Sequence, residues 1–293
     1  MPPSNHSSEA ELWGKKSVSK TEEKPLKETF IQTEEQFPEK TPEPDIEQSM
    51  PLPPWLEYAV PVPDTPEDAP MIAIVIDDLG LNKKMTQLVL SLPAPITAAF
   101  LAYADDLPDQ TKQARLNGHE LMLHVPMEPI DSRFVPGPNA LKTVMSDEEI
   151  VRKLKIMLSA FDGYVGINNH MGSKLTSDKR TVSVVMDMLA QTGLLFLDSL
   201  TSEKSVAWKK ARDKHVPYAV RDVFLDNLHN EEDIMKQLDL LEKYALKRHA
   251  AVAIGHPHPT TINALKKWIP KAKAKGFVFV PVSMIALIKQ DAF

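Results

Sequence analysis

The sequence predicts an α/β fold, a distorted (β/α) barrel of about seven or eight parallel strands. Strand-like apolar runs alternate with helix-like amphipathic stretches along the chain. The first run is short and rich in β-branched residues, as strands buried on both faces are. Acidic, imidazole and other polar side chains gather just after these runs. In such barrels, the carboxyl ends of the strands build the active site.

Eight runs fit strands. Each is a largely apolar segment of four to six residues, which suits a buried strand and is too short for a helix. They are residues 72–76, 96–101, 120–125, 164–168, 194–198, 216–220, 251–255 and 277–280.

Seven stretches fit helices, and several carry helix-start or helix-stop signals. Ser146 begins one stretch, and Glu149 follows three residues later, which is the spacing of a capping box. Gly118, Gly163 and Gly193 lie where helix C-caps are expected. The stretches are residues 83–91, 106–117, 146–161, 178–192, 203–213, 231–248 and 260–275.

Residues 1–70 differ from the rest of the chain in composition. They hold 15 of the 40 acidic residues, 6 of the 34 Lys and Arg residues and 13 of the 25 prolines. Their net charge is therefore −9, which leaves +3 for residues 71–293. We expect residues 1–70 to be a disordered Pro/Glu-rich tail or linker and residues 71–293 to form the barrel domain. Within the tail, residues 51–55 fit an extended linker, with a docking motif as the alternative.

Composition also excludes several classes of protein. The near-neutral domain has no cluster of Lys and Arg that would indicate nucleic-acid binding. The sequence has no run of about 20 apolar residues, so no transmembrane helix is predicted. No secretory signal is readable in residues 1–6, which lack a basic start and an apolar core. Because the chain has no Cys, any metal site must use His, Asp, Glu, backbone or water ligands.

Polar residues recur where the predicted strands end. Because the carboxyl ends of parallel strands meet at one rim, we expect these side chains to lie near one another. The opposite ends carry mainly Pro and Ala. In chain order the rim residues are Asp77, Asp78, Tyr103, His124, Asn168, Asn169, His170, Asp198, Ser199, Arg221, Asp222, His256 and His258.

Asp78, His124 and His170 together predict a metal site. One carboxylate and two imidazoles make a three-ligand set that leaves positions open for water and substrate, as catalytic zinc sites require. The same ligands suit iron, cobalt or nickel. Each residue also has a structural alternative, since the acids could cap the next helix and His124 could be a hydrogen-bonded core histidine.

Asp77, His256 and His258 supply acid–base chemistry beside that site. Water activated by a metal needs a base, and Asp77 adjoins a candidate ligand while remaining free. A leaving group needs an acid, and imidazole has an unperturbed pKa near neutrality. The prolines around His256 and His258 restrict the loop that carries them, although His256 could also simply precede the next helix.

These residues resemble the NodB-type carbohydrate esterases, and most closely the divergent polysaccharide deacetylase family, over about residues 71–293. Asp77-Asp78 is similar to the first motif of that superfamily, in which the first Asp is the general base and the second a metal ligand. Residues 118–124 resemble the second motif, whose first His, here His124, binds metal. That motif normally ends in a second His, and here the position is Glu128. Either Glu128 or His170 would supply the missing ligand, and we expect His170.

The resemblance extends to the later motifs. Asp198 would support the site and His256 would act as the acid. Residues 168–173 stand where the third motif usually has Arg-x-Pro, and residues 169–173 and 255–258 are characteristic of the divergent family. Arg221 and Asp222 form either an ion pair that orients Asp77 or an ordinary salt bridge. The residues predicted only as support or alternative ligands are Glu128, Asn169, Asp198, Arg221 and His258.

The resemblance implies a metal-dependent amidase that removes acetyl groups from an N-acetylated polysaccharide such as peptidoglycan or chitin. It implies a divalent cation, Zn by preference and Co, Ni or Fe as alternatives, and an extracytoplasmic or periplasmic location. Because the second and third motifs are altered, a second class of protein remains as the alternative. It is a non-catalytic glycan-binding or envelope-assembly protein with the same fold. A metal-dependent phosphoesterase is disfavoured, because only Arg221 stands ready on the rim for a phosphate.

Overall fold

The structure, a computed structural model, describes residues 51–62, 66, 68–93 and 95–291. The described strands form one parallel sheet in the order β6-β5-β4-β3-β2-β1-β8-β7, and β9 pairs with the start of β1. The strands are β1 (Met71–Leu79), β2 (Thr97–Leu101), β3 (Glu120–Met127), β4 (Gly166–Met171), β5 (Leu195–Asp198), β6 (Tyr218–Val220), β7 (Val223–Phe224), β8 (Ala250–Gly255) and β9 (Val278–Phe279).

Two residues join the two ends of this sheet. Between β6 and β7, the Arg221 N–H donates to the Asp198 carbonyl of β5, at 3.1 Å. The next N–H, of Asp222, donates to the Val252 carbonyl of β8, at 2.8 Å. One stretch of chain thus changes partners from β5 to β8, and it links the two edges of the curled sheet. The predicted distorted (β/α) barrel of parallel strands is confirmed.

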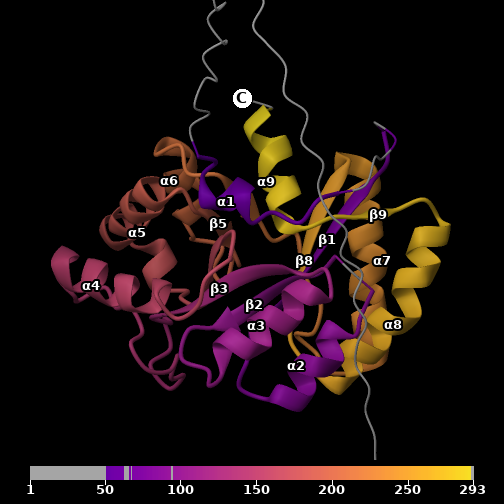
Figure 1. Ribbon diagram of the computed structural model, residues 1–293, viewed down its shortest axis with the longest axis horizontal. Helices are drawn as coiled ribbons and strands as arrows, with labels where there is room; N and C mark the ends of the chain where they lie inside the picture. Colours follow the sequence, from indigo (N-terminus) through magenta and orange to yellow (C-terminus); the bar gives the residue numbers. More distant parts are fainter. Residues whose placement is uncertain (1–50, 63–65, 67, 94, 292–293) are drawn as a thin grey trace, which may run out of the picture. The chain divides into compact units, whose positions relative to one another are not determined.

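Helices surround the strands, with α4 and α5 on one side in Figure 1 and α7 and α8 on the other. No helix in the described part of the chain has the length and hydrophobicity needed to cross a bilayer. The helices are α1 (Pro54–Glu57), α2 (Lys83–Leu90), α3 (Leu107–Leu116), α4 (Asp147–Leu158), α5 (Lys179–Thr192), α6 (Ala207–Asp213), α7 (Glu231–Arg248), α8 (Pro259–Ala274) and α9 (Val282–Asp291), with a 3-10 turn, η1 (Leu175–Ser177).

Every strand and helix predicted from the sequence is present in the structure, and four further elements were not predicted: α1, β7, α9 and the 3-10 turn η1. Strand β7 is two residues long, too short for a periodicity. Helix α9 is apolar on almost every side through residue 288, and such a run cannot be assigned by periodicity. Helix α1 lies in the predicted linker. Residues 1–50 of the predicted tail lie outside the described residues.

The prediction that residues 51–55 are an extended linker is wrong. Pro53 and Pro54 fix the start of α1, where a missing N–H costs nothing. The Trp55 N–H donates to the Gly193 carbonyl at 3.1 Å, and the Trp55 side chain is buried. Trp55 packs in the same apolar cluster as Val282 and Ile285 of α9. Burial of this indole anchors the segment to the barrel.

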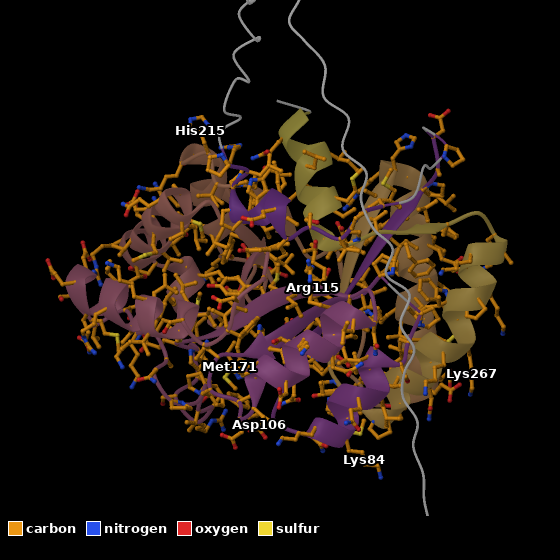
Figure 2. The ribbon with its side chains drawn as sticks, viewed as in Figure 1. Lys84, Asp106, Arg115, Met171, His215 and Lys267 are labelled. Carbon is orange, nitrogen blue, oxygen red and sulfur yellow. The ribbon has the colours of Figure 1, made fainter. Side chains whose placement is uncertain are left out.

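Alternation along the strands divides the core into two clusters. Ile72, Ile74 and Ile76 of β1 pack with the surrounding helices, whereas Ala73 and Val75 belong to the second cluster, inside the barrel. The second cluster also contains Trp55 and apolar side chains of α9, which therefore contribute to the barrel interior. The amino ends of the strands lie far from the carboxyl ends, as His215 before β6 and Met171 at the end of β4 show in Figure 2.

Glu120, the first residue of β3, is a fully buried carboxyl group on the side of α9. It accepts hydrogen bonds from the Thr97 hydroxyl, at 3.1 Å, and from the Ser283 N–H, at 3.2 Å, and also from the Ser283 hydroxyl. Burial raises the pKa of Glu120, although these donors oppose the shift. The Glu120 carboxyl group therefore links α9 to the barrel. The free-energy cost of burying it depends on whether it is protonated.

Glu120→Gln is expected to remove a pH-dependent loss of stability. The pKa of Glu120 is higher in the folded than in the unfolded chain, so its protonated form stabilises the fold at low pH. That contribution is lost as pH rises from about 4.3 through the folded pKa. Urea unfolding from pH 4 to pH 8 should show the wild type losing stability relative to Glu120→Gln over that range. A difference between the two proteins that stays constant with pH would contradict this.

Candidate metal centre and its neighbours

Asp78, His124 and His170, here called the Asp78 cluster, converge at the carboxyl ends of β1, β3 and β4. Asp78 Oδ1 lies 2.8 Å from His170 Nδ1 and 3.3 Å from His124 Nε2. The two imidazole nitrogens are 3.2 Å apart. Zinc binds such ligands at about 2.0–2.2 Å, so ligand atoms around one ion lie roughly 3–3.5 Å apart. The three atoms thus already have the spacing of a shared cation.

The electrostatics of the Asp78 cluster also fit a cation. Asp78 Oδ1 is buried, and no described residue donates to it with hydrogen-bond geometry, despite the two nearby nitrogens. Such an orphaned carboxylate oxygen is costly unless it is paired. The imidazoles hold the pKa of Asp78 far below its usual range, even though burial opposes this. The carboxylate is therefore ionised and ready to ligate.

Strand parity explains which side chains reach the centre. Asp77 follows Ala73 and Val75 on the interior face of β1, and His124 follows Met122 on β3. A bulge follows in β1, since the register with β2 shifts between Ile76 and Leu79. Asp78 has a left-handed backbone with φ of 57°. The bulge lets two adjacent carboxylates face one site, which a regular strand would not allow.

Asn168 connects the Asp78 cluster with Asp77. Its Oδ1 lies 2.8 Å from His124 Nδ1, and its Nδ2 donates to Asp77 Oδ1 at 2.8 Å. Because the amide oxygen only accepts, Nδ1 of His124 carries a proton, and Nε2 is the ring nitrogen that faces Asp78. Asn168 was predicted on the rim but not as a site residue, and its position on the interior face of β4 is the signal for this role.

Asp77 lies within this network. It is 3 % exposed, and its Oδ2 is 3.6 Å from His124 Nε2. Burial raises the pKa of Asp77, against the opposing effects of His124, His256 and the Asn168 amide. A buried carboxylate with a raised pKa is a stronger base than an exposed one.

His256 pairs with Asp226, a residue that the sequence analysis missed. Its Nδ1 lies 3.0 Å from Asp226 Oδ1, and its backbone N–H donates to Asp226 Oδ2 at 2.6 Å. The Thr261 hydroxyl also donates to Oδ2, at 2.8 Å. Burial alone would lower the pKa of His256, but Asp226 and then Asp77 raise it to about 9. Asp226 follows the two-residue strand β7, so no recognisable strand pattern pointed to it.

Glu128 is held away from the Asp78 cluster. Its Oε2 accepts from the N–H and the hydroxyl of Thr143, both at 2.7 Å, and its Oε1 accepts from Lys174 Nζ at 2.7 Å. These donors lower the pKa of Glu128 against the effect of burial. The structure therefore brings His170, and not Glu128, to Asp78 and His124. Gly172, two residues after His170, has a left-handed backbone. A Cβ atom at Gly172 would lie 2.8 Å from Met127 Cβ.

Asp198 does not support the candidate centre as expected. It is on the same face of β5 as Phe196, which packs with the helices. Its carboxylate accepts from the Leu200 N–H at 2.9 Å, the Ser205 hydroxyl at 2.7 Å and the Trp208 N–H at 3.3 Å. Asp198 therefore organises the loop before α6.

The predicted Arg221–Asp222 ion pair is wrong. Arg221 Nε donates to the Ser199 carbonyl at 2.7 Å and Nη2 to the Leu200 carbonyl at 2.8 Å. Asp222 instead pairs with Arg248 Nη1, at 2.8 Å. Arg221 therefore anchors the loop after β5 rather than orienting Asp77 through Asp222.

Asn169 and His258 occupy supporting positions. Asn169 is buried, accepts from the Ser199 N–H at 3.0 Å and donates to the Met171 carbonyl at 2.8 Å, so it holds two rim loops together. His258 is the residue before α8, and its ring centroid lies 4.2 Å from that of His229. Neither belongs to the Asp78 cluster.

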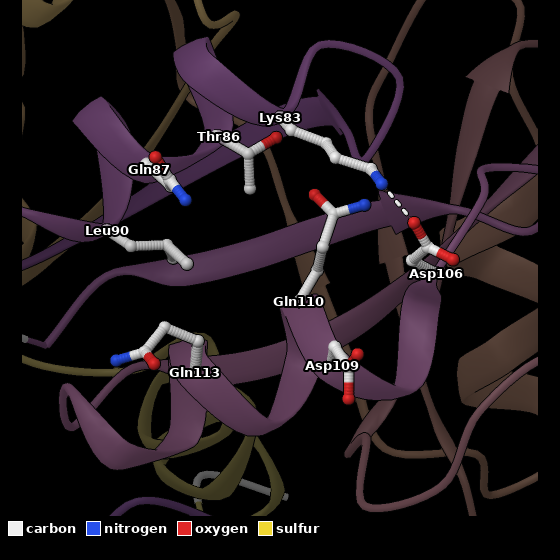
Figure 3. A pocket seen from close by; sticks show the side chains of 8 residues that line it. All are labelled: Lys83, Thr86, Gln87, Leu90, Asp106, Asp109, Gln110 and Gln113. Carbon is white, nitrogen blue, oxygen red and sulfur yellow. Dashed lines mark hydrogen bonds and ion pairs between the residues drawn. The ribbon is translucent and has the colours of Figure 1, made fainter.

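A separate cavity of 260 Å³ lies between α2 and α3 (Figure 3). Its Lys83 and Asp106 pair with each other. Gln110 donates to the backbone carbonyls of Gly80 and Asp105, at 3.0 Å and 2.8 Å. The residues that line it include none of the site candidates, so this cavity is not part of the centre.

Comparison with known proteins decides the family. The model of the divergent polysaccharide deacetylases matches residues 74–286, a range that contains the Asp78 cluster, Asp77, Asp226 and His256. The chain belongs to this family.

Two curated relatives and two solved structures are similar to this family member. YibQ of Escherichia coli K12, an uncharacterized protein, is 36% identical over 205 residues, 70% of this chain and 64% of YibQ. An uncharacterized protein of Haemophilus influenzae is 33% identical over 195 residues, 67% of this chain and 69% of the relative. The match thus spans less than two thirds of YibQ.

The uncharacterized protein ATU2773 of Agrobacterium tumefaciens C58 superposes with a TM-score of 0.77 at 29% identity, covering 80% of this chain and 95% of that one. EF3048 of Enterococcus faecalis V583, described as a putative cellobiose-phosphate cleavage protein, has a TM-score of 0.55 at 13% identity and covers 74% of this chain and 99% of that one. The latter likeness shows the fold alone.

Proposed function

We propose that this deacetylase-family chain is a metal-dependent amidase that removes acetyl groups from an N-acetylated polysaccharide. One observation carries the proposal: Asp78 Oδ1, buried and without a hydrogen-bond donor among the described residues, lies between two imidazole nitrogens. The family match supports the substrate class. A polysaccharide substrate also favours an extracytoplasmic location. Fractionation of cells that produce the protein tests this location. Recovery outside the cytoplasm would support it, and recovery in the cytoplasm would contradict it.

Asp78, His124 and His170 would hold the cation. A divalent metal bound there acts as a Lewis acid on the acetamide carbonyl and makes water more acidic, and Zn fits these nitrogen and oxygen ligands. Asn168 fixes the His124 ring, so that Nε2 stays available as a ligand. These residues would therefore hold the cation next to Asp77, whose Oδ2 lies 3.6 Å from His124 Nε2.

Asp77 would take the proton of the attacking water. Its carboxylate is buried, with one oxygen held by the Asn168 amide and the other directed toward His124 at 3.6 Å. Burial raises the pKa of Asp77, which makes its carboxylate a stronger base. The proton would then rest on Asp77 while the carbon–nitrogen bond remains intact.

His256 would protonate the leaving amine. Since its pKa is about 9, the imidazolium form dominates at neutral pH. Asp226 holds Nδ1, which leaves Nε2 as the nitrogen that donates. Proton transfer to the amine breaks the carbon–nitrogen bond and releases acetate and the free amino sugar.

Acetate release from N-acetylglucosamine oligomers and from peptidoglycan, measured on zinc-loaded full-length protein, tests the proposal directly. We expect release that stops when the metal is chelated and resumes when zinc is returned. Glycan binding without acetate release under Zn, Co, Ni or Fe would overturn the amidase and favour the glycan-binding alternative. Phosphate release from a generic phosphoester, without acetate release, would favour a phosphoesterase.

Asp226→Asn is expected to shift the alkaline limb of the rate profile to lower pH. His256 acts as an acid only while protonated, so activity falls as pH rises through its pKa, which is about 9 in the wild type. Removing the negative charge of Asp226 lowers that pKa toward the ordinary value of about 6.5. The measurement is kcat/KM from pH 6 to pH 10. An unchanged alkaline limb would show that His256 is not the acid.

A further inference from the structure

A second group of ligating side chains lies at the start of α8. Asp226, His256 and His258, here called the Asp226 cluster, offer one carboxylate oxygen and two ring nitrogens within 4.8 Å of one another. The Asp226 side chain is 0% exposed and that of His256 is 22% exposed. The proposed reaction uses His256 and Asp226 but gives His258 no role.

In the Asp226 cluster, one carboxylate oxygen is held by two fixed donors and the other faces His256. The Thr261 hydroxyl and the His256 N–H both donate to Asp226 Oδ2, which fixes the carboxylate. Oδ1 faces only His256 Nδ1, at 3.0 Å. Two ligand atoms on one zinc ion lie roughly 3–3.5 Å apart, because each bond is about 2.0–2.2 Å long. A cation could therefore replace the proton between these two atoms without moving either residue far.

His258 completes a three-ligand set. Its ring centroid lies 6.0 Å from that of His256, and the loop between them is held by the His258 N–H, which donates to the His256 carbonyl at 2.7 Å. Pro257 and Pro259 restrict that loop further. Two imidazoles and one carboxylate form a site for zinc, nickel or copper, and a poor one for magnesium or calcium.

We propose that the Asp226 cluster is a second, weaker binding site for a divalent transition metal, and that a metal bound there inhibits the enzyme. Binding replaces the proton on His256 Nδ1, which passes to solvent. A metal on His256 Nδ1 excludes a proton from that nitrogen, so the ring can no longer take its imidazolium form and Nε2–H is a far weaker acid. General-acid catalysis is then weakened while the Asp78 cluster stays intact.

The order of affinities follows from the surroundings of the two clusters. The positive end of the α8 dipole lies beside His258, which is the residue before the helix, and disfavours a cation there. Asp226 Oδ1 already has His256 Nδ1 as a partner at 3.0 Å, whereas Asp78 Oδ1 is buried with no hydrogen-bond donor among the described residues. The first equivalent of zinc should therefore occupy the Asp78 cluster and the second the Asp226 cluster.

Equilibrium dialysis of the full chain against zinc tests the site without any measurement of activity. We expect two bound zinc ions per wild-type chain and one per His258→Ala chain. Asn227→Ala, in the same loop as Asp226, is the matched control and should keep two. Should His258→Ala not fold, His258→Gln is judged by the same criterion. A single zinc ion in the wild type, or two in the folded His258 variant, would overturn the second site.

The inhibitory effect rests on the proposed deacetylation and has its own assay. Excess zinc should lower wild-type acetate release about 10²-fold or more relative to one equivalent, since general acids contribute about 10²–10⁴-fold. In His258→Ala, the rate of acetate release with excess zinc should be nearly equal to the rate with one equivalent. Equal inhibition of both proteins would overturn the regulatory role. Two zinc ions with no acetate release under any condition would instead refute the proposed function and leave the second site standing.

Discussion

Replacing Asp77 with Asn is expected to lower kcat for acetate release by about 10²–10⁴-fold, the usual contribution of a general base. Asparagine has the same shape and can still accept the hydrogen bond that the Asn168 amide donates at 2.8 Å. It cannot take a proton from water. The fold and the metal site should therefore survive while the chemical step fails. Acetate release and zinc content are measured on the same preparation.

Asp78→Asn is the matched comparison, because it makes the same chemical change one residue further along. Asp78 contributes the carboxylate oxygen that lies between His124 and His170. We expect this variant to lose zinc as well as activity, whereas Asp77→Asn keeps its zinc. Wild-type acetate release in Asp77→Asn would eliminate Asp77 as the base, and loss of zinc from that variant would reassign it as a ligand.

His170→Ala is expected to lower zinc affinity by more than about 100-fold and to lower acetate release accordingly. Removing even a partner of a metal ligand costs about 10–100-fold in affinity, so loss of a ligand itself should exceed that range. His170 Nδ1 is within 3.2 Å of both Asp78 Oδ1 and His124 Nε2. Zinc affinity is measured by competition with a chromophoric chelator.

Glu128→Gln is the control for the alternative ligand. Thr143 and Lys174 hold the Glu128 carboxylate away from the Asp78 cluster, and glutamine can still accept from Thr143. We expect zinc affinity to remain within about twofold of the wild type, since no ligand is removed. A loss of affinity in Glu128→Gln comparable to that in His170→Ala would show that Glu128 ligates the cation in solution.

The sequence was informative where chemistry follows regular structure. Asp77, His124, His170 and His256 were predicted at strand ends because short apolar runs precede them, and strand parity brings Asp77 and His124 to the interior face. The parity of Asp198 directs it to the helices instead, and this could have been noticed from Phe196 two residues earlier. A rim position alone does not make a site residue.

The remaining features depend on local geometry that no pattern in one sequence encodes. The bulge at Asp78 appears only in the register between β1 and β2. Asp226 follows a strand of two residues, and its partner His256 lies 30 residues later in the sequence, after α7. Trp55 lies in a proline-rich segment whose composition resembles a linker, yet one buried indole fixes it to the barrel. In each case a single tertiary contact outweighs the local signal.

The position of the first bound zinc ion tests the central claim most directly. Crystals of the full chain with one equivalent of zinc, measured by anomalous scattering at the zinc edge, should show one ion held by Asp78 Oδ1, His124 Nε2 and His170 Nδ1. An ion bound first at Glu128 or at the Asp226 cluster, or no ordered ion at all, would contradict the assignment of the Asp78 cluster as the metal centre.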